Sequence, residues 1–251
     1  MRGEFDSLAT LGLSLPGRLG DVTVKLHTGE VTAICGPNGA GKSTLLTCLA
    51  GLVAPGSGLV TLADGDLAKL PPKTRAQKIG FLPQTPEIAW DVNVDVLVTL
   101  GRLPWGDEGA PSGRAAVDEV IAAMDLEALR HRPVSQLSGG ERARALMARV
   151  LATQPKWLLA DEPLANLDLA HAATLVRRMK TQAREGRGVV LVLHDLATAM
   201  NHADRVIVLD RGRVAADSEP FKALAQDVIA RVWGCEARWL GDPGQRALAI
   251  V

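Results

Sequence analysis

The segment that most constrains the fold is a glycine-rich pattern near the N-terminus. Residues 36–43 have the sequence GPNGAGKS, which fits the phosphate-loop pattern G-x-x-x-x-G-K-[ST]. The pattern follows an apolar run at Val31–Cys35 that is typical of a buried strand, and we expect a helix to begin near Ser43. A chance match in 251 residues is roughly a one-in-a-hundred event. The sequence therefore predicts an α/β protein that binds a phosphorylated ligand.

Each part of this loop has a predicted contact with the ligand. Gly39 and Gly41 let the backbone turn its N–H groups toward phosphate oxygens, assisted by the positive end of the helix. Lys42 is expected to reach the β- and γ-phosphates, and the Ser43 hydroxyl to ligate Mg²⁺. The residues predicted to contact the nucleotide here are Gly36, Pro37, Asn38, Gly39, Ala40, Gly41, Lys42, Ser43 and Thr44.

The remaining apolar runs predict a mostly parallel sheet. Residues 79–82, 157–160, 189–193 and 206–209 have the length of buried strands and alternate with helical patterns. Between residues 99 and 133 the spacing becomes helical, which predicts a helical insertion at about 90–135. We expect one domain over 1–251, with a core at about 1–89 and 136–251, one amphipathic helix at 221–228 and a terminal hairpin.

Composition excludes several classes of protein. The 28 basic and 28 acidic side chains give a net charge of zero, and the aromatic content of 3% includes no Tyr. Neither feature suits a protein that binds nucleic acid over a broad surface. No apolar run approaches the ~18–20 residues of a membrane-spanning helix. Glu4 and Asp6 argue against a secretory signal, and the three widely spaced cysteines predict a reduced, cytosolic chain.

Two carboxylates close the strand predicted at 157–160. Asp161 is expected to hold Mg²⁺ through water, and Glu162 to polarise the attacking water as a general base. Considered alone, such a strand end is equally consistent with a helix-capping role. Its presence in a chain with a phosphate loop favours the metal and base roles.

A second helix start also carries glycines. Leu137 is followed by Ser138, Gly139, Gly140 and Glu141, where a helix is predicted to begin and to run through Val150. The backbone N–H groups of these four residues are therefore predicted to form a second anion site. The alternative is a capping box between Ser138 and Glu141. A small-molecule kinase with a phosphate loop has no use for this segment.

With these motifs the chain resembles the nucleotide-binding subunit of an ABC transporter. The order of motifs matches throughout: phosphate loop, Gln84 after a strand, signature 137–141, acidic strand to Glu162, the ANLD segment ending at Asp168, then His194. The resemblance implies an ABC-type domain of the P-loop NTPase fold, with an antiparallel β subdomain and a helical insertion. It also implies that Gln84 senses Mg²⁺ and the transmembrane partner, that Asp168 crosses a dimer interface, and that His194 contacts the γ-phosphate.

The resemblance further implies the partners. The signature of one subunit caps ATP held by the phosphate loop of another, so a chain with one copy of each motif is expected to form a homodimer. We expect ATP and Mg²⁺ as cofactors, polytopic permease subunits, a periplasmic or surface substrate-binding protein, no nucleic acid, and a peripheral location on the cytoplasmic face of the membrane. The docking surface for the permease is expected at the Gln84 loop and the 90–135 insertion. Trp90 and Trp105 flank this region, and packing of either side chain in the core is an equally good alternative to docking.

The nearest pattern is that of importers of iron chelates, haem and vitamin B12. It is carried by FLPQ at 81–84, by Val94 with GRLP at 101–104, and by EPLANLD at 162–168. The GRLP segment also fits a plain helix end followed by a proline. The alternative function is a soluble ABC-type ATPase for assembly, such as iron–sulfur cluster scaffolding. ATPases of DNA maintenance carry long coiled coils, and no sustained heptads occur here.

One wall of the predicted ATP site departs from the family pattern. Family members usually place an aromatic residue, which stacks on adenine, some 25–30 residues before the phosphate-loop lysine. The window at 13–17 has no aromatic residue, so adenine is expected to rest on Leu13 or Leu15, or on nothing specific. This predicts weaker discrimination between ATP and GTP.

Overall fold

The protein is described from a computed structural model, which covers residues 7–85, 90–165 and 167–251. The chain divides into two compact units, one formed by residues 1–70 and 179–251 and the other by residues 71–178. The predictions that involve Glu4, Asp6 and Asn166 lie outside the described residues.

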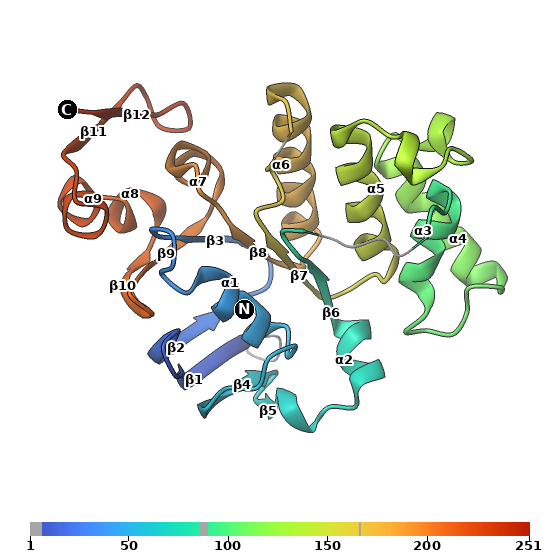
Figure 1. Ribbon diagram of the computed structural model, residues 1–251, viewed down its shortest axis with the longest axis horizontal. Coiled ribbons are helices and arrows are strands. Elements are labelled where there is room, and N and C mark those ends of the chain that lie inside the picture. Colours follow the sequence, from blue (N-terminus) through green and yellow to red (C-terminus); the bar gives the residue numbers. More distant parts are fainter. Residues whose placement is uncertain (1–6, 86–89, 166) are drawn as a thin grey trace. The chain divides into compact units, whose positions relative to one another are not determined.

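The first unit begins with an antiparallel sheet that the apolar runs did not predict. Its strands are β1 (Leu8–Leu15), β2 (Leu19–Leu26), β4 (Ser57–Leu62) and β5 (Gly65–Asp66), in the order β2-β1-β4-β5 (Figure 1). A 3₁₀ turn at Leu67–Lys69 follows. In β2 the buried residues alternate with exposed ones, so Val22, Val24 and Leu26 face the core. This sheet matches the antiparallel subdomain that the family resemblance implies.

The parallel strands of the first unit hold the phosphate loop. β3 (Val31–Cys35) runs parallel to both β8 (Gly188–Val192) and β9 (Arg205–Asp210), and β10 (Arg213–Ser218) pairs antiparallel with β9. Every residue of β3 is buried, as expected for a strand with neighbours on both sides. α1 (Lys42–Leu49) follows β3, and α7 (Leu196–His202) follows β8. The strand and helix predictions are confirmed here to within a residue or two.

The C-terminal part of this unit differs from its prediction in one respect. The single helix expected at 221–228 is two helices, α8 (Pro220–Ala223) and α9 (Gln226–Trp233), because Ala225 is extended and starts a new helix. The new start lets α9 bury Val228, Ile229 and Val232 while Phe221 stays exposed. The terminal hairpin is confirmed as β11 (Ala237–Leu240) and β12 (Ala247–Ile250).

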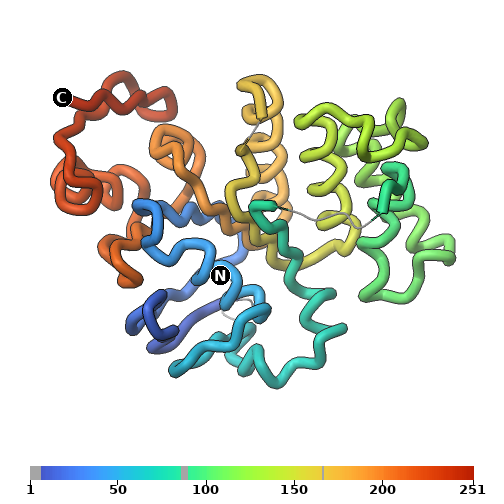
Figure 2. The backbone as a smooth tube through the Cα atoms, in the orientation of Figure 1, coloured from blue at the N-terminus to red at the C-terminus, as the bar shows by residue number. Residues whose placement is uncertain are grey.

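The second unit combines two parallel strands with a helical segment. β6 (Ile79–Leu82) and β7 (Trp157–Asp161) pair in parallel, and α2 (Pro72–Lys78) precedes β6. The helices α3 (Val94–Thr99), α4 (Pro111–Ala123) and α5 (Gly139–Ala152) pack on one another, as the green to yellow tube shows in Figure 2. Short 3₁₀ turns lie at Leu100–Arg102, Glu127–Leu129 and Val134–Gln136, and α6 (Leu169–Arg184) begins in this unit.

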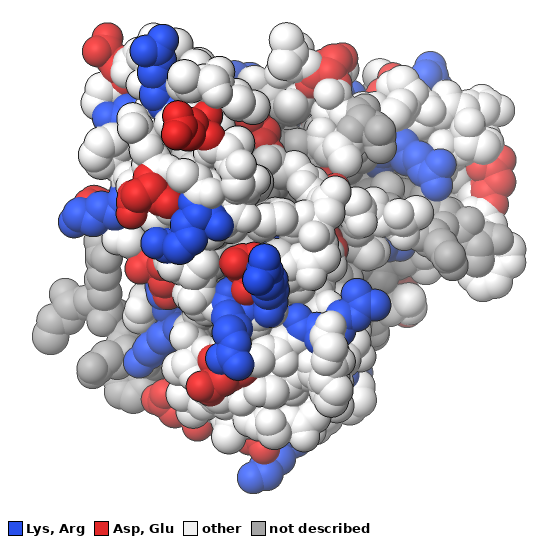
Figure 3. All heavy atoms as spheres, turned by 60° about the vertical axis from the view of Figure 1, so that its left-hand side comes forward, with Lys and Arg blue, Asp and Glu red and all other residues white. Residues whose placement is uncertain are grey.

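Surface charge agrees with the zero net charge. On the face that Figure 3 draws, basic and acidic side chains lie interspersed.

The buried thiols Cys35 and Cys48 lie at the end of β3 and in α1, and burial raises the pKa of the Cys35 thiol to about 12. No helix in the described part of the chain is long and apolar enough to span a bilayer.

Candidate nucleotide-binding site

The phosphate loop leads directly from β3 into the first turn of α1. Gly41 is the N-cap residue of α1, in a left-handed conformation with φ +98°, and the Leu45 N–H donates to its carbonyl at 2.8 Å. No side chain caps this helix end, and its first turn has no acidic residue. The first backbone N–H groups of a helix have no acceptor within the helix, so this end presents donors to an anion.

Two glycines of the loop are required by their surroundings. A Cβ on Gly41 would lie 2.8 Å from both the Arg18 carbonyl oxygen and Leu19 Cδ2. A Cβ on Gly36 would lie 2.2 Å from the Leu209 carbonyl oxygen. The loop is therefore packed against the β1–β2 turn and against β9, and larger residues at these positions would displace it.

Lys42 folds back over the loop. Its side chain is buried, and its Nζ donates to the carbonyl oxygens of Gly36 at 2.9 Å and Pro37 at 3.0 Å. Ser43 is exposed and Thr44 half-buried. The loop carbonyls thus hold the lysine ammonium against the loop, where its charge can neutralise a bound phosphate.

His194 belongs to the same unit. It is exposed just beyond β8, which runs parallel to β3, so His194 and the phosphate loop follow the carboxyl ends of neighbouring strands. The carboxyl edge of a parallel sheet is where ligands bind in α/β folds. Leu13 is fully buried, so of the two leucines considered for adenine only Leu15 offers surface.

In the second unit the structure brings Gln84 and Glu162 together. The Gln84 Nε2 donates to the Glu162 Oε2 at 2.7 Å. Their proximity follows from the parallel pairing of β6 and β7, in which Leu82 lies opposite Ala160. Gln84 and Glu162 each come two residues after this pair, so they leave the sheet at the same edge. Glu162 adopts φ +50°, an uncommon conformation for a residue with a side chain, which redirects the chain at the end of β7.

A cleft of about 320 Å³ surrounds this pair. Its lining includes Gln84, Asp161, Glu162, and Gly139 and Arg142 of α5. Asp161 is 5% exposed. Carboxylate, amide and hydroxyl oxygens are the donors that Mg²⁺ prefers, so Asp161, the Gln84 amide oxygen and Ser43 fit that ion in chemistry. Among the described residues, no three His, Cys, Asp or Glu side chains form a cluster that could hold a metal on their own.

The start of α5 is a capping box, the alternative weighed for this segment. The Ser138 Oγ accepts from the Glu141 N–H at 3.3 Å, and the Glu141 Oε2 accepts from the Ser138 N–H at 2.8 Å. The Ser138 N–H holds the pKa of Glu141 below its usual range. Gly139 is exposed and Gly140 half-buried, and neither carries a side chain over this helix end. The capping box orders the helix start and is compatible with an anion at the glycine N–H groups.

His171 is a residue of this region that sequence analysis missed. The Asp168 carboxylate accepts from the His171 N–H at 2.8 Å, and its other oxygen lies 2.7 Å from the His171 Nδ1. These contacts, first the backbone hydrogen bond, lower the pKa of Asp168. A Cβ on Gly140 would lie 3.2 Å from the His171 ring, so the ring lies against the start of α5. Only the i,i+3 spacing of Asp168 and His171 at a helix start gave a signal in the sequence.

The predicted residues thus fall into two groups. The first unit contains the phosphate loop and His194. The second unit contains Gln84, Ser138–Glu141, Asp161, Glu162 and Asp168. The joining of the two groups around one nucleotide stays a prediction. A phosphate loop at a helix start, with a glutamine–glutamate pair at the carboxyl end of parallel strands, defines a P-loop nucleotide-binding protein.

Comparison with known proteins narrows this class. Residues 19–165 match the ABC transporter family, and the chain belongs to that family. It is an ATP-binding subunit that hydrolyses ATP. The predicted fold is confirmed.

Two relatives have the same description. The hemin import ATP-binding protein HmuV of Rhodococcus jostii is 43% identical, over 93% of this chain and 80% of that protein. The protein of the same name from Streptomyces coelicolor is 41% identical, over 96% of this chain and 87% of that protein.

Among solved structures, a dimeric ATP-binding cassette in a post-hydrolysis state with ADP and Pi has a TM-score of 0.75 to this chain. It is 28% identical, with coverage of 85% of this chain and 98% of that one. The two HmuV relatives confirm the resemblance to haem importers.

Proposed function

We propose that this chain is the ATP-hydrolysing subunit of a membrane importer for hemin. The observation that carries the proposal is the Gln84–Glu162 hydrogen bond of 2.7 Å in a cleft that α5 also lines, in a chain 43% identical to a hemin import ATP-binding protein. The same relatives favour transport over the alternative of an assembly ATPase.

The phosphate loop binds ATP in this proposal. The backbone N–H groups of 36–44 and the Lys42 ammonium hold the β- and γ-phosphates. Burial and two carbonyl contacts keep Lys42 in place before the nucleotide arrives, so little side-chain entropy is lost on binding.

Glu162 acts as the general base. Its carboxylate accepts the proton of the attacking water while Gln84 holds one carboxylate oxygen through its amide N–H. Because the amide N–H of Gln84 is directed at Glu162, its amide oxygen is the group left to meet the metal. Ser43, Gln84 and Asp161 would hold Mg²⁺, which would supply positive charge to neutralise the phosphates. His194 contacts the γ-phosphate.

The active form is a homodimer. Ser138, Gly139, Gly140 and Glu141 of one subunit face the ATP held by the other, and Asp168 lies at the interface. Support comes from the single copy of each motif in the chain and from the dimeric state of the similar cassette with ADP and Pi. ATP between two helix starts favours the closed dimer, and loss of the γ-phosphate removes contacts that only the closed state makes.

The membrane partner is a separate permease, and the chain lies at the cytoplasmic face of the membrane. Trp90 is 76% exposed and Trp105 42% exposed, which supports the segment 90–135 as the docking surface. A periplasmic or surface binding protein delivers hemin to the permease.

The experiment is growth on hemin as the sole iron source. A strain that lacks this chain is expected to grow only when the wild-type chain is restored, and Glu162→Gln is expected to fail. Glu236→Gln, the same change at an exposed position outside the 90–135 segment, is the matched control and should restore growth. Growth of the deletion strain on hemin at the wild-type rate would contradict the proposed substrate.

A further inference from the structure

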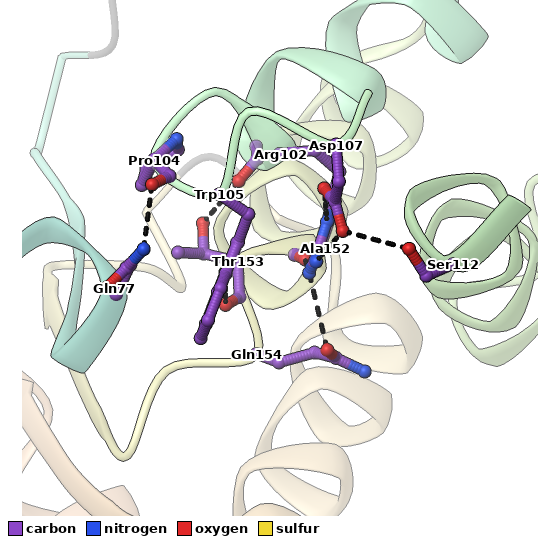
Figure 4. A network of polar contacts seen from close by, with 10 residues as sticks. Gln77, Arg102, Pro104, Trp105, Asp107, Ser112, Ala152, Thr153 and Gln154 are labelled. Carbon is purple, nitrogen blue, oxygen red and sulfur yellow. Dashed lines mark hydrogen bonds and ion pairs between the residues drawn. The ribbon is translucent and has the colours of Figure 1, made fainter. Parts of the chain in front are cut away.

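The GRLP segment, which sequence analysis left with two interpretations, is attached to the end of α5 by a buried arginine. Arg102 is 4% exposed. Its Nε and Nη2 donate to the two carboxylate oxygens of Asp107 at 3.0 and 2.7 Å. Its Nη1 donates to the Ala152 carbonyl oxygen at 2.7 Å and to the Gln154 Oε1 at 3.3 Å (Figure 4). One planar guanidinium therefore joins the loop after α3 to the last turn of α5.

Neighbouring residues make the same connection. The Thr153 Oγ1 donates to the Gly101 carbonyl oxygen at 2.9 Å, and the Trp105 Nε1 donates to the Thr153 carbonyl oxygen at 2.8 Å (Figure 4). A Cβ on Gly101 would lie 2.1 Å from the Arg149 carbonyl oxygen, so the loop backbone lies directly on α5. The last carbonyl groups of a helix need donors from outside it and favour a nearby cation, and Arg102 and Trp105 supply both.

The attached loop also lines a groove. This groove has a volume of about 360 Å³ and is lined by Ile79, Phe81, Leu100, Leu103, Pro104 and Val150, among others. Leu103 is 56% exposed and Trp105 42% exposed. We call residues 100–107 the groove rim. The rim lies in the segment proposed above to dock the permease.

α5 has these two features at its two ends. It begins at Gly139, next to its N-cap Ser138, where the proposed contact with ATP lies, and ends at Ala152, whose carbonyl accepts a hydrogen bond from Arg102. Its 14 residues span about 21 Å. A continuous helix transmits a displacement of one end to the other. A neighbouring loop moves with the far end of the helix only if it is firmly attached there.

We propose that Arg102 is a positioning residue that makes the groove rim follow α5, so that ATP binding at the start of α5 is communicated to the rim. This inference rests on the proposed function, which places ATP at the start of α5. The guanidinium suits the task because its fork reaches a carboxylate and a carbonyl in different segments, which a lysine cannot do at once. Pairing with Asp107 makes the buried charge tolerable.

The test is hydrogen exchange by mass spectrometry on the full chain, with and without ATP. Glu162→Gln serves as the parent so that ATP is not consumed. In the parent, ATP is expected to slow exchange in α5 and in the groove rim by similar factors. In Arg102→Met on this parent, ATP should still slow α5, while the rim exchanges about tenfold faster than in the parent and no longer responds to ATP.

Three further variants keep the test decisive. Arg102→Lys keeps the charge without the fork and should lose the ATP response of the rim in part. Asp107→Asn keeps the size of its side chain and replaces Arg102→Met if that variant does not fold. Arg114→Met removes a bidentate pair with Asp95, between α4 and α3, and should leave the rim response intact.

The outcomes separate this inference from the proposed function. A rim that responds to ATP equally in the parent and in both Arg102→Met and Asp107→Asn overturns the role of Arg102. A parent in which α5 responds and the rim does not also overturns it, while the proposed function stands. A parent in which α5 itself does not respond to ATP contradicts the proposed contact at Ser138–Gly140, and the inference falls with it.

Discussion

Alanine substitution at two glycines of the phosphate loop gives a quantitative test of the loop's geometry. Gly39 and Gly41 both have positive φ, +78° and +98°. A Cβ on Gly39 would meet nothing within 4 Å, whereas a Cβ on Gly41 would lie 2.8 Å from the Arg18 carbonyl oxygen and from Leu19 Cδ2. The two variants therefore share the backbone cost and differ in the steric cost.

The expected free energies follow from these contacts. An alanine in a left-handed conformation costs about 1–2 kcal/mol. Forcing extra volume into a packed site costs about 1–3 kcal/mol more. Gly39→Ala should therefore lower the free energy of unfolding by about 1–2 kcal/mol, and Gly41→Ala by about 2–5 kcal/mol. At about 2–4 °C per kcal/mol for a chain of this size, Tm should fall by about 2–8 °C and about 4–20 °C respectively.

Thermal unfolding with and without ATP measures both stability and binding. ATP at 100 times its Kd should stabilise the wild-type chain by about 2.7 kcal/mol, which raises Tm by about 5–11 °C. Gly41→Ala should lose most of this rise because the start of α1 is displaced, and Gly39→Ala should keep more of it. Equal losses of Tm in the two variants, or a full ATP effect in Gly41→Ala, would refute the packing argument.

Three other predictions concern the nucleotide and the helical segment. Lys42→Ala is expected to abolish nucleotide binding in an equilibrium titration, and normal affinity would contradict its role. GTP is expected to compete with ATP better than in a site with a stacked aromatic, because of the two candidate leucines only Leu15 has exposed surface for adenine. Strict preference for ATP in a competition assay would exclude this weak base discrimination. The hydrogen bond from Arg114 holds the pKa of Asp95 below its usual range, so the pair stabilises the fold above about pH 3.9 and loses this effect as pH falls through the folded-state pKa. The difference in free energy of unfolding between the wild type and Asp95→Asn should therefore be full at pH 7 and vanish in strong acid, and a pH-independent difference in urea unfolding would be inconsistent with this pair.

Features encoded in contiguous residues could be predicted from the sequence. β3 and α1 flank a motif whose glycines and lysine act through the local backbone, and their positions were predicted to within a residue. β6, β7 and β9 are short apolar runs buried on both faces, which gives a continuous signal. The pairing of Gln84 with Glu162 then follows from the parallel register of β6 and β7.

Other features could not be found this way, for identifiable reasons. β1 has register shifts between Thr10 and Leu13, where Gly12 has φ +58°, so the alternation of a half-buried strand is interrupted. β2 does alternate, and its pattern could have predicted the strand. The break between α8 and α9 depends on how α9 packs. The contact of Arg102 with Ala152 joins residues 50 positions apart, and no local pattern encodes it.

The most direct test of the central claim is single-turnover hydrolysis of ATP by Glu162→Gln. We expect this variant to bind ATP, to form a stable ATP-bound dimer and to hydrolyse ATP at least about 10²-fold more slowly than the wild type. Size-exclusion chromatography of the same sample shows whether the dimer persists. Hydrolysis at the wild-type rate, with a dimer that loses ATP as fast as the native protein, would contradict the assignment of Glu162 as the general base.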